Sequence, residues 1–185
     1  MTELLSPAGN FEKLRTALRF GADAVYIAGK RFGMRSAAEN FTEPELEEAA
    51  EYVHSRGKKL YITINTLPRT DEYGALADYL KKLAKIKPDA LIIADVGVFS
   101  LAKELIPDAD IHISTQAGIV SAADCLFWRS LGAKRAVLAR ELSLAEITEL
   151  RKEVPNDFEI EAFVHGSMCV SFSGRCLLSN ALTGR

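Results

Sequence analysis

The sequence predicts an α/β fold, specifically a TIM-type (β/α) barrel that is incomplete and has about seven βα units. Three observations lead to this prediction. Short β-rich runs alternate with helical segments seven times, and several of these runs are almost wholly apolar. Successive runs also begin roughly 20 to 35 residues apart, which is the size of one βα unit. An open doubly wound parallel sheet is the alternative architecture.

The expected strands are short segments rich in apolar and β-branched residues. Ala90–Ala94 and Ala136–Ala139 are apolar throughout, which is typical of strands that are buried on both faces of a parallel sheet. The seven predicted strands are Glu3–Ser6, Ala24–Ala28, Leu60–Ile64, Ala90–Ala94, Ile111–Ser114, Ala136–Ala139 and Phe158–Val164.

The segments between the strands carry apolar residues at helical spacing. Leu46, Ala49, Ala50 and Val53 fall on one face of a helix, and similar faces occur within 11–18 and 76–84. Start and stop signals agree with these helices, because capping-box pairs precede two of them and glycines follow three at the C-terminal position that favours a left-handed backbone. These signals are Thr42 with Glu45, Ser143 with Glu146, and Gly21, Gly57 and Gly132.

The turn after the first strand favours the barrel over the doubly wound sheet. It reads Ser6-Pro7-Ala8-Gly9-Asn10 and lacks the glycine-rich phosphate-binding pattern of dinucleotide-binding sheets. Seven similar units in a row also exceed the usual five or six strands of an open sheet. A closed barrel has eight strands, so we expect residues 1–185 to form a single barrel-like domain that stops before the eighth strand.

Composition excludes several classes of protein. Apolar residues make up 48% of the chain and charged residues 26%, which is typical of a globular protein and not of a disordered one. No apolar run has the length of a membrane helix, and the N-terminus lacks the basic start of a secretory signal. Three cysteines are too few for a disulfide framework, so we expect a cytoplasmic protein without a membrane span.

The net charge argues against RNA binding as the only role of the chain. It is −2, from 23 basic and 25 acidic residues, whereas a protein held to nucleic acid by phosphate contacts alone is usually basic. This balance still allows an enzyme that modifies RNA.

Polar residues follow the predicted strands at the end where parallel α/β folds bind their ligands. Each of them alone is explained by a cap or a turn, but together they predict a polar pocket. The residues of this predicted rim are Ser6, Pro7, Gly9, Gly29, Lys30, Asn65, Asp95, Ser114, Thr115, Gln116, Arg140, Glu141, His165, Gly166 and Ser167.

Arg140 is the rim residue best suited to hold an anionic substrate, because its guanidinium can bind two oxygens at once. The alternative is a structural ion pair with Glu141 or Glu161. His112 lies inside a predicted strand, where a buried histidine with satisfied hydrogen bonds is the expectation. Cys125 falls on a helix beside Leu126 and Trp128, which indicates a core thiol.

The C-terminal segment places two cysteines close to the predicted rim. Cys169 and Cys176 lie in a stretch rich in glycine and serine. Two thiolates do not complete a tetrahedral zinc site or an iron–sulfur site, which usually needs four ligands. From spacing alone the pair is therefore half of a metal or cluster site, ordinary thiols, or a redox-active pair.

The chain resembles the collagenase-like peptidase family, the U32 peptidases, over essentially all of its length. The resemblance begins at Glu3-Leu-Leu-Ser-Pro-Ala-Gly-Asn10 and continues through Gly21–Tyr26, Phe32–Arg35, Asn65–Leu67, Ser114–Gln116 and Leu138–Glu141. It is strongest in Glu161-x-Phe163-x-His165-Gly166-Ser167-Met168-Cys169, followed by Gly174-Arg175-Cys176-Leu-Leu-Ser179.

The resemblance implies a TIM-type barrel and an oxygen-independent hydroxylation of a pyrimidine in transfer or ribosomal RNA, or of a ubiquinone precursor. It also implies prephenate as the oxygen donor and a four-iron four-sulfur cluster. Two of the four cluster cysteines correspond to Cys169 and Cys176, and the other two follow a Thr-Gly-Arg like Thr183–Arg185, where this chain ends. We therefore expect a fragment that is inactive alone.

On this interpretation the cluster lies beside the barrel mouth, and the polar rim holds the anionic donor. The residues that we assign to that site are Asn65, Gln116, Arg140, Glu141 and His165 for catalysis, with Cys169 and Cys176 as metal and cofactor ligands.

Peptidase activity, as a hydrolase of the collagenase-like type, is the alternative function, and a non-catalytic scaffold is a second one. The sequence contains no H-E-x-x-H zinc pair and no G-x-S-x-G turn. His165 with Ser167 or with Cys169 would be the residues of a peptidase site. An unpaired seventh strand would also favour a homo- or hetero-dimer.

Overall fold

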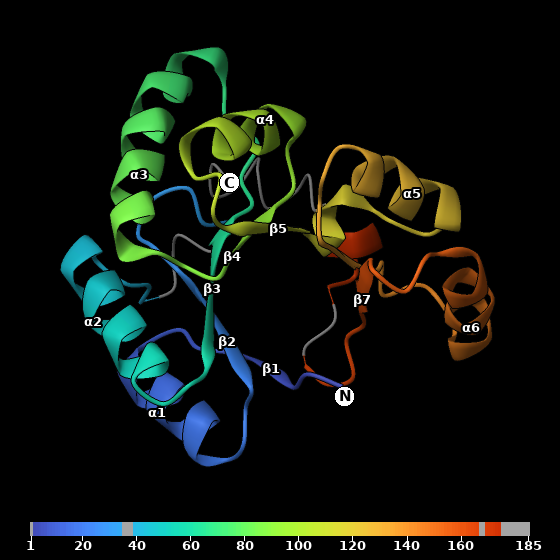
Figure 1. Ribbon diagram of the computed structural model, residues 1–185, viewed down its shortest axis with the longest axis horizontal. Helices are drawn as coiled ribbons and strands as arrows, with labels where there is room; N and C mark the ends of the chain where they lie inside the picture. The colour runs from blue at the N-terminus through green and yellow to red at the C-terminus, as the bar shows by residue number, and fades with distance from the viewer. Residues whose placement is uncertain (1, 35–38, 167–168, 175–185) are drawn as a thin grey trace.

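Seven parallel strands lie side by side in sequence order and curl into an open arc, with the helices on its outer side (Figure 1). The structure is a computed structural model that describes residues 2–34, 39–166 and 169–174. The strands are β1 (Leu5–Pro7), β2 (Ala24–Ala28), β3 (Lys59–Ile64), β4 (Ala90–Ile93), β5 (Asp110–Ile113), β6 (Arg135–Val137) and β7 (Glu159–Glu161).

The strand order confirms the incomplete barrel. Each strand pairs in parallel only with its neighbours in sequence, so the order never reverses as it does in a doubly wound sheet. The strand centres match the predictions, and the bounds differ by up to three residues. The largest difference is at β7, where the predicted strand 158–164 narrows to Glu159–Glu161 because the chain leaves the sheet at Ala162.

Six α-helices and three short 3-10 helices connect or follow the strands within the described residues. The caps predicted for α2 and α6 are present: the Thr42 hydroxyl accepts a hydrogen bond from the Glu45 amide, and Ser143 and Glu146 pair in the same way. The helices are α1 (Phe11–Arg19), α2 (Glu43–His54), α3 (Tyr73–Ile86), α4 (Val96–Leu105), α5 (Ala122–Ser130) and α6 (Leu144–Glu153), with η1 (Thr70–Glu72), η2 (Thr115–Ala117) and η3 (Phe172–Gly174).

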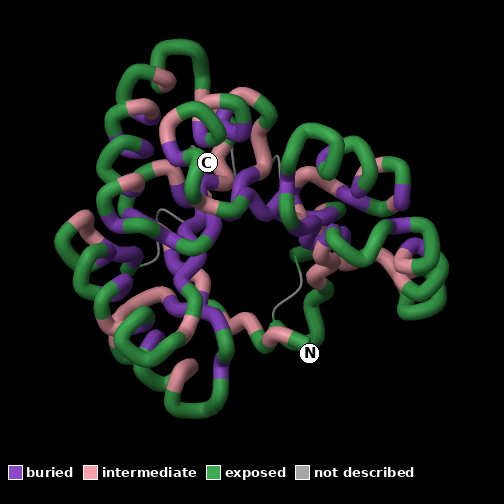
Figure 2. The backbone as a smooth tube through the Cα atoms, viewed as in Figure 1, coloured by how far each residue is buried: buried purple, intermediate pink, exposed green. Residues whose placement is uncertain are grey.

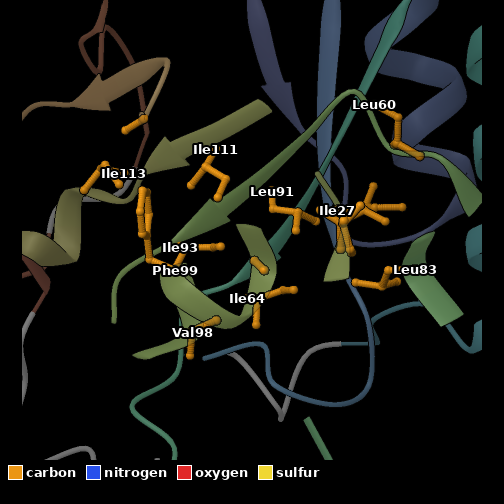
Figure 3. Packing of buried hydrophobic residues seen from close by; sticks show 14 of the residues in the cluster. Ile27, Leu60, Ile64, Leu83, Leu91, Ile93, Val98, Phe99, Ile111 and Ile113 are labelled. Atoms are coloured by element: carbon orange, nitrogen blue, oxygen red, sulfur yellow. The ribbon is translucent and has the colours of Figure 1, made fainter. Parts of the chain in front are cut away.

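The main core lies between the outer face of the sheet and the helices. Alternate strand residues, among them Leu91, Ile93 and Ile113, pack against helix residues such as Leu83 and Phe99 (Figure 3). Figure 2 shows the same division, with buried residues concentrated along the strands and exposed residues on the outer faces of the helices. The two-faced burial that predicted a parallel sheet is therefore confirmed.

The inner face of the sheet carries a smaller cluster. Ala24, Tyr61, Ala90 and Ile92 are buried there, with Leu5 and Tyr26 partly buried against them. Two alanines alternate here with larger side chains, and these side chains fill the interior of the arc as they do in a barrel. The carboxyl ends of all seven strands consequently share one end of the arc, the end where the polar rim was predicted.

In the part of the chain that the structure describes, no helix is both long enough and apolar enough to cross a membrane.

Candidate functional site

Asn65 and Gln116 lie at neighbouring points of the rim because both contact Met34. Asn65 follows β3, and its side-chain oxygen accepts a hydrogen bond from the Met34 amide at 3.1 Å. Gln116 lies in η2, after β5, and its side-chain nitrogen contacts the Met34 sulfur. The segment after β2 thus reaches from β3 to η2, and two of the predicted site residues meet at one place.

Glu141, which follows β6, binds the C-terminal segment. Its two carboxylate oxygens accept hydrogen bonds from the Ser173 amide at 2.6 Å and from the Ser173 hydroxyl at 2.8 Å. The Ser173 amide, together with the hydroxyl, outweighs the effect of burial and lowers the pKa of Glu141 below its ordinary value. Ser173 belongs to η3, which packs against η2 beside Gln116. These contacts place residues 169–174 on the rim.

Arg140 lies beside this contact with a nitrogen that lacks a partner. Its Nε atom is buried and has no hydrogen bond to any described residue. The ion pair with Glu161 that was the structural alternative is wrong, because Glu161 binds Arg135 instead. Arg140 does contribute, by its charge, to the lowered pKa of Glu141, although the two form no ion pair in the described ranges. The Arg140 Nε–H is therefore a donor without an acceptor among the described residues.

His165 and Cys169 lie beyond β7 and are both exposed. The Cys169 sulfur accepts a hydrogen bond from the Ser171 amide at 3.4 Å. Cys176 and Ser167 lie outside the described residues, so the distance between the two late thiols stays a prediction.

Other rim residues have structural roles, as the simpler interpretation predicted. Asp95 caps α4 by accepting a hydrogen bond from the Val98 amide at 2.9 Å, and it also binds the Tyr73 hydroxyl at 3.1 Å. The Ser114 hydroxyl caps η2. Cys125 is buried, and burial raises the pKa of its thiol to about 11, which confirms a core thiol.

The opposite end of the sheet holds a buried ionic network that sequence analysis missed. Arg135, only 6% exposed, binds three carboxylates, with distances of 2.8 Å to Glu3, 2.5 Å to Glu159 and 3.2 Å to Glu161. The Tyr61 hydroxyl donates to Glu3 at 2.8 Å. The signal was present, because charged residues occupy alternate positions of β7 and the first position of β6.

Burial and Arg135 affect these carboxylates in opposite ways. Burial acts to raise the pKa of Glu3, but hydrogen bonds from Arg135 and Tyr61 outweigh it, so that this pKa is lowered. For Glu161 burial prevails over the attraction of Arg135, and its pKa is raised. Arg135 and Glu159 begin their strands and Glu3 precedes β1, so most of this network lies at the amino ends of the strands, whereas ligands of barrel proteins bind at the carboxyl ends.

His112 lies in the same region and differs from its prediction in one respect. It is buried, at 2% exposure, and its ring meets Tyr61 edge-on with centroids 4.7 Å apart. Its Nδ1 atom, however, has no hydrogen-bond partner among the described residues, so the expected satisfied histidine is wrong on that point. A cavity of about 110 Å³ adjoins it, lined by Lys59, Tyr61, Asp89, Asp110, His112, Arg135 and Glu159.

The described residues hold no group of three or more histidine, cysteine or acidic side chains arranged to bind a metal ion. The chemistry of the one late thiol that is described fits a cluster ligand, because Cys169 is exposed at the rim and accepts a backbone N–H hydrogen bond, an interaction that tunes metal-bound sulfur.

A curled parallel sheet with polar side chains at its carboxyl end defines an α/β protein of the incomplete-barrel class. Comparison with known proteins identifies its family: residues 9–185 match the model of peptidase family U32, and the chain belongs to that family. The solved structure of the U32 peptidase Mk0906 superposes with a TM-score of 0.72, at 20% identity, over 88% of this chain and 68% of that one, which supports the fold.

Several curated relatives are named for RNA hydroxylation. The tRNA hydroxylation protein P of Helicobacter pylori (strain J99) is 47% identical over 99% of this chain and 43% of its own length. The 23S rRNA 5-hydroxycytidine C2501 synthase of Escherichia coli (strain K12) is 39% identical over 99% of this chain and 27% of its own length. The chain thus spans less than half the length of these relatives.

Proposed function

We propose that this chain is the barrel-bearing part of an enzyme that hydroxylates a pyrimidine base in RNA, with transfer RNA as the preferred substrate. The observation that carries the proposal is the alignment of 99% of the chain with proteins named for tRNA hydroxylation and for 5-hydroxycytidine synthesis. The rim supports it, because Asn65, Gln116 and Glu141 come from separate strand ends and are joined by contacts through Met34 and Ser173.

Hydroxylation converts a ring C–H into C–OH, which oxidises the base by two electrons. Without molecular oxygen, the oxygen atom comes either from water, with a separate two-electron acceptor, or from a donor that is itself reduced by two electrons. We propose that prephenate, a dicarboxylate, is this donor and that Arg140 binds one of its carboxylates. Support comes from the buried Nε of Arg140, which has no partner in the described part of the chain and which a carboxylate oxygen would satisfy.

We also propose a four-iron four-sulfur cluster held by Cys169, by Cys176 and by two ligands outside this chain. A bound cluster would supply one-electron chemistry at a potential that hydrogen bonds to its sulfurs adjust. The described residues would act around it: Asn65 and Gln116 at the rim orient the base or donor, and Glu141 holds the segment that carries Cys169. His165, exposed beyond β7, is available to move a proton.

The experiment uses a protein that includes this chain and is as long as the curated relatives. It is purified anaerobically and reconstituted with iron and sulfide. It is incubated with unmodified tRNA and with prephenate labelled with ¹⁸O in its hydroxyl group, and nucleosides are analysed by mass spectrometry. The expected result is a hydroxylated pyrimidine that carries the label. An unlabelled product would reject prephenate as the donor, and no product on tRNA or rRNA would reject RNA hydroxylation.

Arg140→Ala and Arg140→Lys are the matched variants. Both should raise the prephenate concentration needed for half-maximal rate. Arg140→Ala should raise it tenfold or more, and Arg140→Lys should raise it less, because lysine keeps the positive charge but does not bind two carboxylate oxygens at once. A ubiquinone precursor and gelatin serve as alternative substrates in parallel reactions. Cleavage of gelatin that is lost in Cys169→Ala would favour the peptidase function that the family name suggests.

A further inference from the structure

We propose that Glu141 is a positioning residue that anchors residues 169–174 to the barrel rim and thereby fixes the Cys169 thiol there. The role of that thiol rests on the proposed function, but the anchoring itself does not. The inference follows from the contacts of Glu141, from the burial of Ser173, and from a comparison with the two glutamates that complete capping boxes.

The contact between Glu141 and Ser173 is bidentate and joins distant parts of the chain. Both carboxylate oxygens are used, one by the Ser173 amide at 2.6 Å and the other by its hydroxyl at 2.8 Å. Hydrogen bonds to an ionised acceptor are roughly twice as strong as those between neutral groups. The two residues are 32 positions apart, so the contact ties the C-terminal segment to the end of β6.

Among residues 169–173, Ser173 is buried and the others are exposed or half-buried. Cys169, Val170 and Phe172 are exposed, Ser171 is half-buried, and Ser173 is fully buried. Its backbone is left-handed, with φ 47° and ψ 30°, a conformation that is uncommon for residues other than glycine. Such a conformation persists where surrounding contacts hold it, and Glu141 supplies two of them.

The two glutamates that complete capping boxes, Glu45 and Glu146, differ from Glu141 because they bind locally. Glu45 and Glu146 each accept hydrogen bonds from the residue three positions earlier, in capping boxes that begin their own helices. Glu141 also lies just before a helix, α6, but its carboxylate binds Ser173 and leaves the capping of that helix to Ser143 and Glu146. Its role is therefore long-range and differs from that of a helix cap.

The anchored segment orients the thiol. The Ser171 amide lies between Cys169 and Ser173 and donates to the Cys169 sulfur at 3.4 Å. Fixing Ser173 fixes this short turn and, with it, the direction of the sulfur. Release of Ser173 should therefore leave Cys169 mobile while the barrel, whose core lies elsewhere, stays folded.

The test attaches a nitroxide spin label to Cys169 in a Cys176→Ser background, with the remaining cysteine, Cys125, buried and unreactive. Electron paramagnetic resonance at room temperature then reports the mobility of the label. We expect Glu141→Ala to shorten the rotational correlation time of the label at least threefold. Glu141→Gln should keep most of the parent's immobility, because its amide oxygen still accepts a hydrogen bond. Ser173→Ala should give a correlation time between those of the parent and of Glu141→Ala.

Glu146→Ala is the matched control, because it removes an equally hydrogen-bonded carboxylate five residues further on that does not touch the segment. It should lower the melting temperature without changing the label's mobility. Equal mobility in Glu141→Ala and in the parent protein would overturn the inference, as would equal mobilisation by Glu146→Ala. Melting curves and far-ultraviolet circular dichroism establish that each variant is folded.

The label needs neither cluster nor RNA, so its result separates this inference from the proposed function. In the longer protein, Glu141→Ala should also retain at least threefold less iron per chain after reconstitution and gel filtration. If the label becomes mobile but the parent protein never binds iron, the cluster is rejected and the anchoring stands. If the cluster forms but the label does not respond to Glu141→Ala, the anchoring is rejected and the function stands.

Discussion

The guanidinium of Arg135 lies 2.8 Å from the carboxylate of Glu3, so a side chain from β6 reaches across the inner face of the sheet to the residue that leads into β1. Arg135 also binds Glu159 and Glu161 of β7. One cation thus binds the edge strand β7 and the residue two positions before the other edge strand, β1. In an arc that lacks a closing strand among the described residues, this network fixes how far apart its ends lie.

Arg135→Met should destabilise the protein by about 3 kcal/mol, because removing one partner of a buried ion pair leaves uncompensated carboxylates. Urea unfolding at pH 7 measures this change. Arg129→Met is the control, since the Arg129–Asp157 pair is exposed, and exposed ion pairs contribute little to stability. Similar losses in the two variants would contradict a special role for Arg135.

The repeat of strand and helix could be predicted because it follows from local patterns. Apolar runs such as Ala90–Ile93 and the Thr42–Glu45 cap each lie within a few residues of sequence. The Arg135 network could not be predicted from the sequence. It depends on how far the sheet curls, because the curl decides which distant carboxylates come within reach of one side chain.

In the candidate site, too, local sequence patterns predict some features and not others. The rim positions of Asn65, Gln116 and Glu141 follow from strand ends, which periodicity locates. Their partners, Met34 and Ser173, are contributed by loops whose paths no periodicity encodes. The sequence therefore predicted that these three residues follow strand ends, but not which contacts they form.

Gly29→Ala should destabilise the protein by roughly 1 to 3 kcal/mol through overpacking. A β-carbon at this position would lie 2.1 Å from the Tyr79 hydroxyl, which is buried and has no hydrogen-bond partner among the described residues. Tyr79→Phe alone should therefore change stability little. In the double variant the phenylalanine should recover much of the loss, and a double-mutant cycle by urea unfolding measures the coupling. Additive effects would rule out this contact as the cause.

Asp95→Ala should lower stability by about 1 kcal/mol, the usual cost of losing a helix N-cap, because the α4 cap and the partner of Tyr73 are both removed. Asp95→Asn should be close to the parent protein, since asparagine caps helices equally well. On the proposed function, we expect both variants, built into the longer protein, to keep the parental rate in the tRNA assay at 25 °C. A large loss of rate in Asp95→Asn would show that this carboxylate takes part in the reaction.

His112 should make the protein less stable as the pH falls. Burial, together with the charge of Arg135, lowers the pKa of His112 to about 3, whereas an unfolded chain binds a proton on histidine near pH 6.5. Between these two pH values the unfolded state binds more protons than the folded state. The contribution of His112 to the free energy of unfolding is therefore fully present above about pH 6.5, and it declines as the pH falls toward 3, by up to about 1.4 kcal/mol per pH unit.

His112→Phe tests this prediction, because it keeps a ring against Tyr61 and removes the unpartnered nitrogen. It should match or exceed the parent's stability at pH 7 and unfold at a urea midpoint that changes less between pH 7 and 5. An unchanged pH dependence in His112→Phe would assign the acid sensitivity to the carboxylates of the Arg135 network instead.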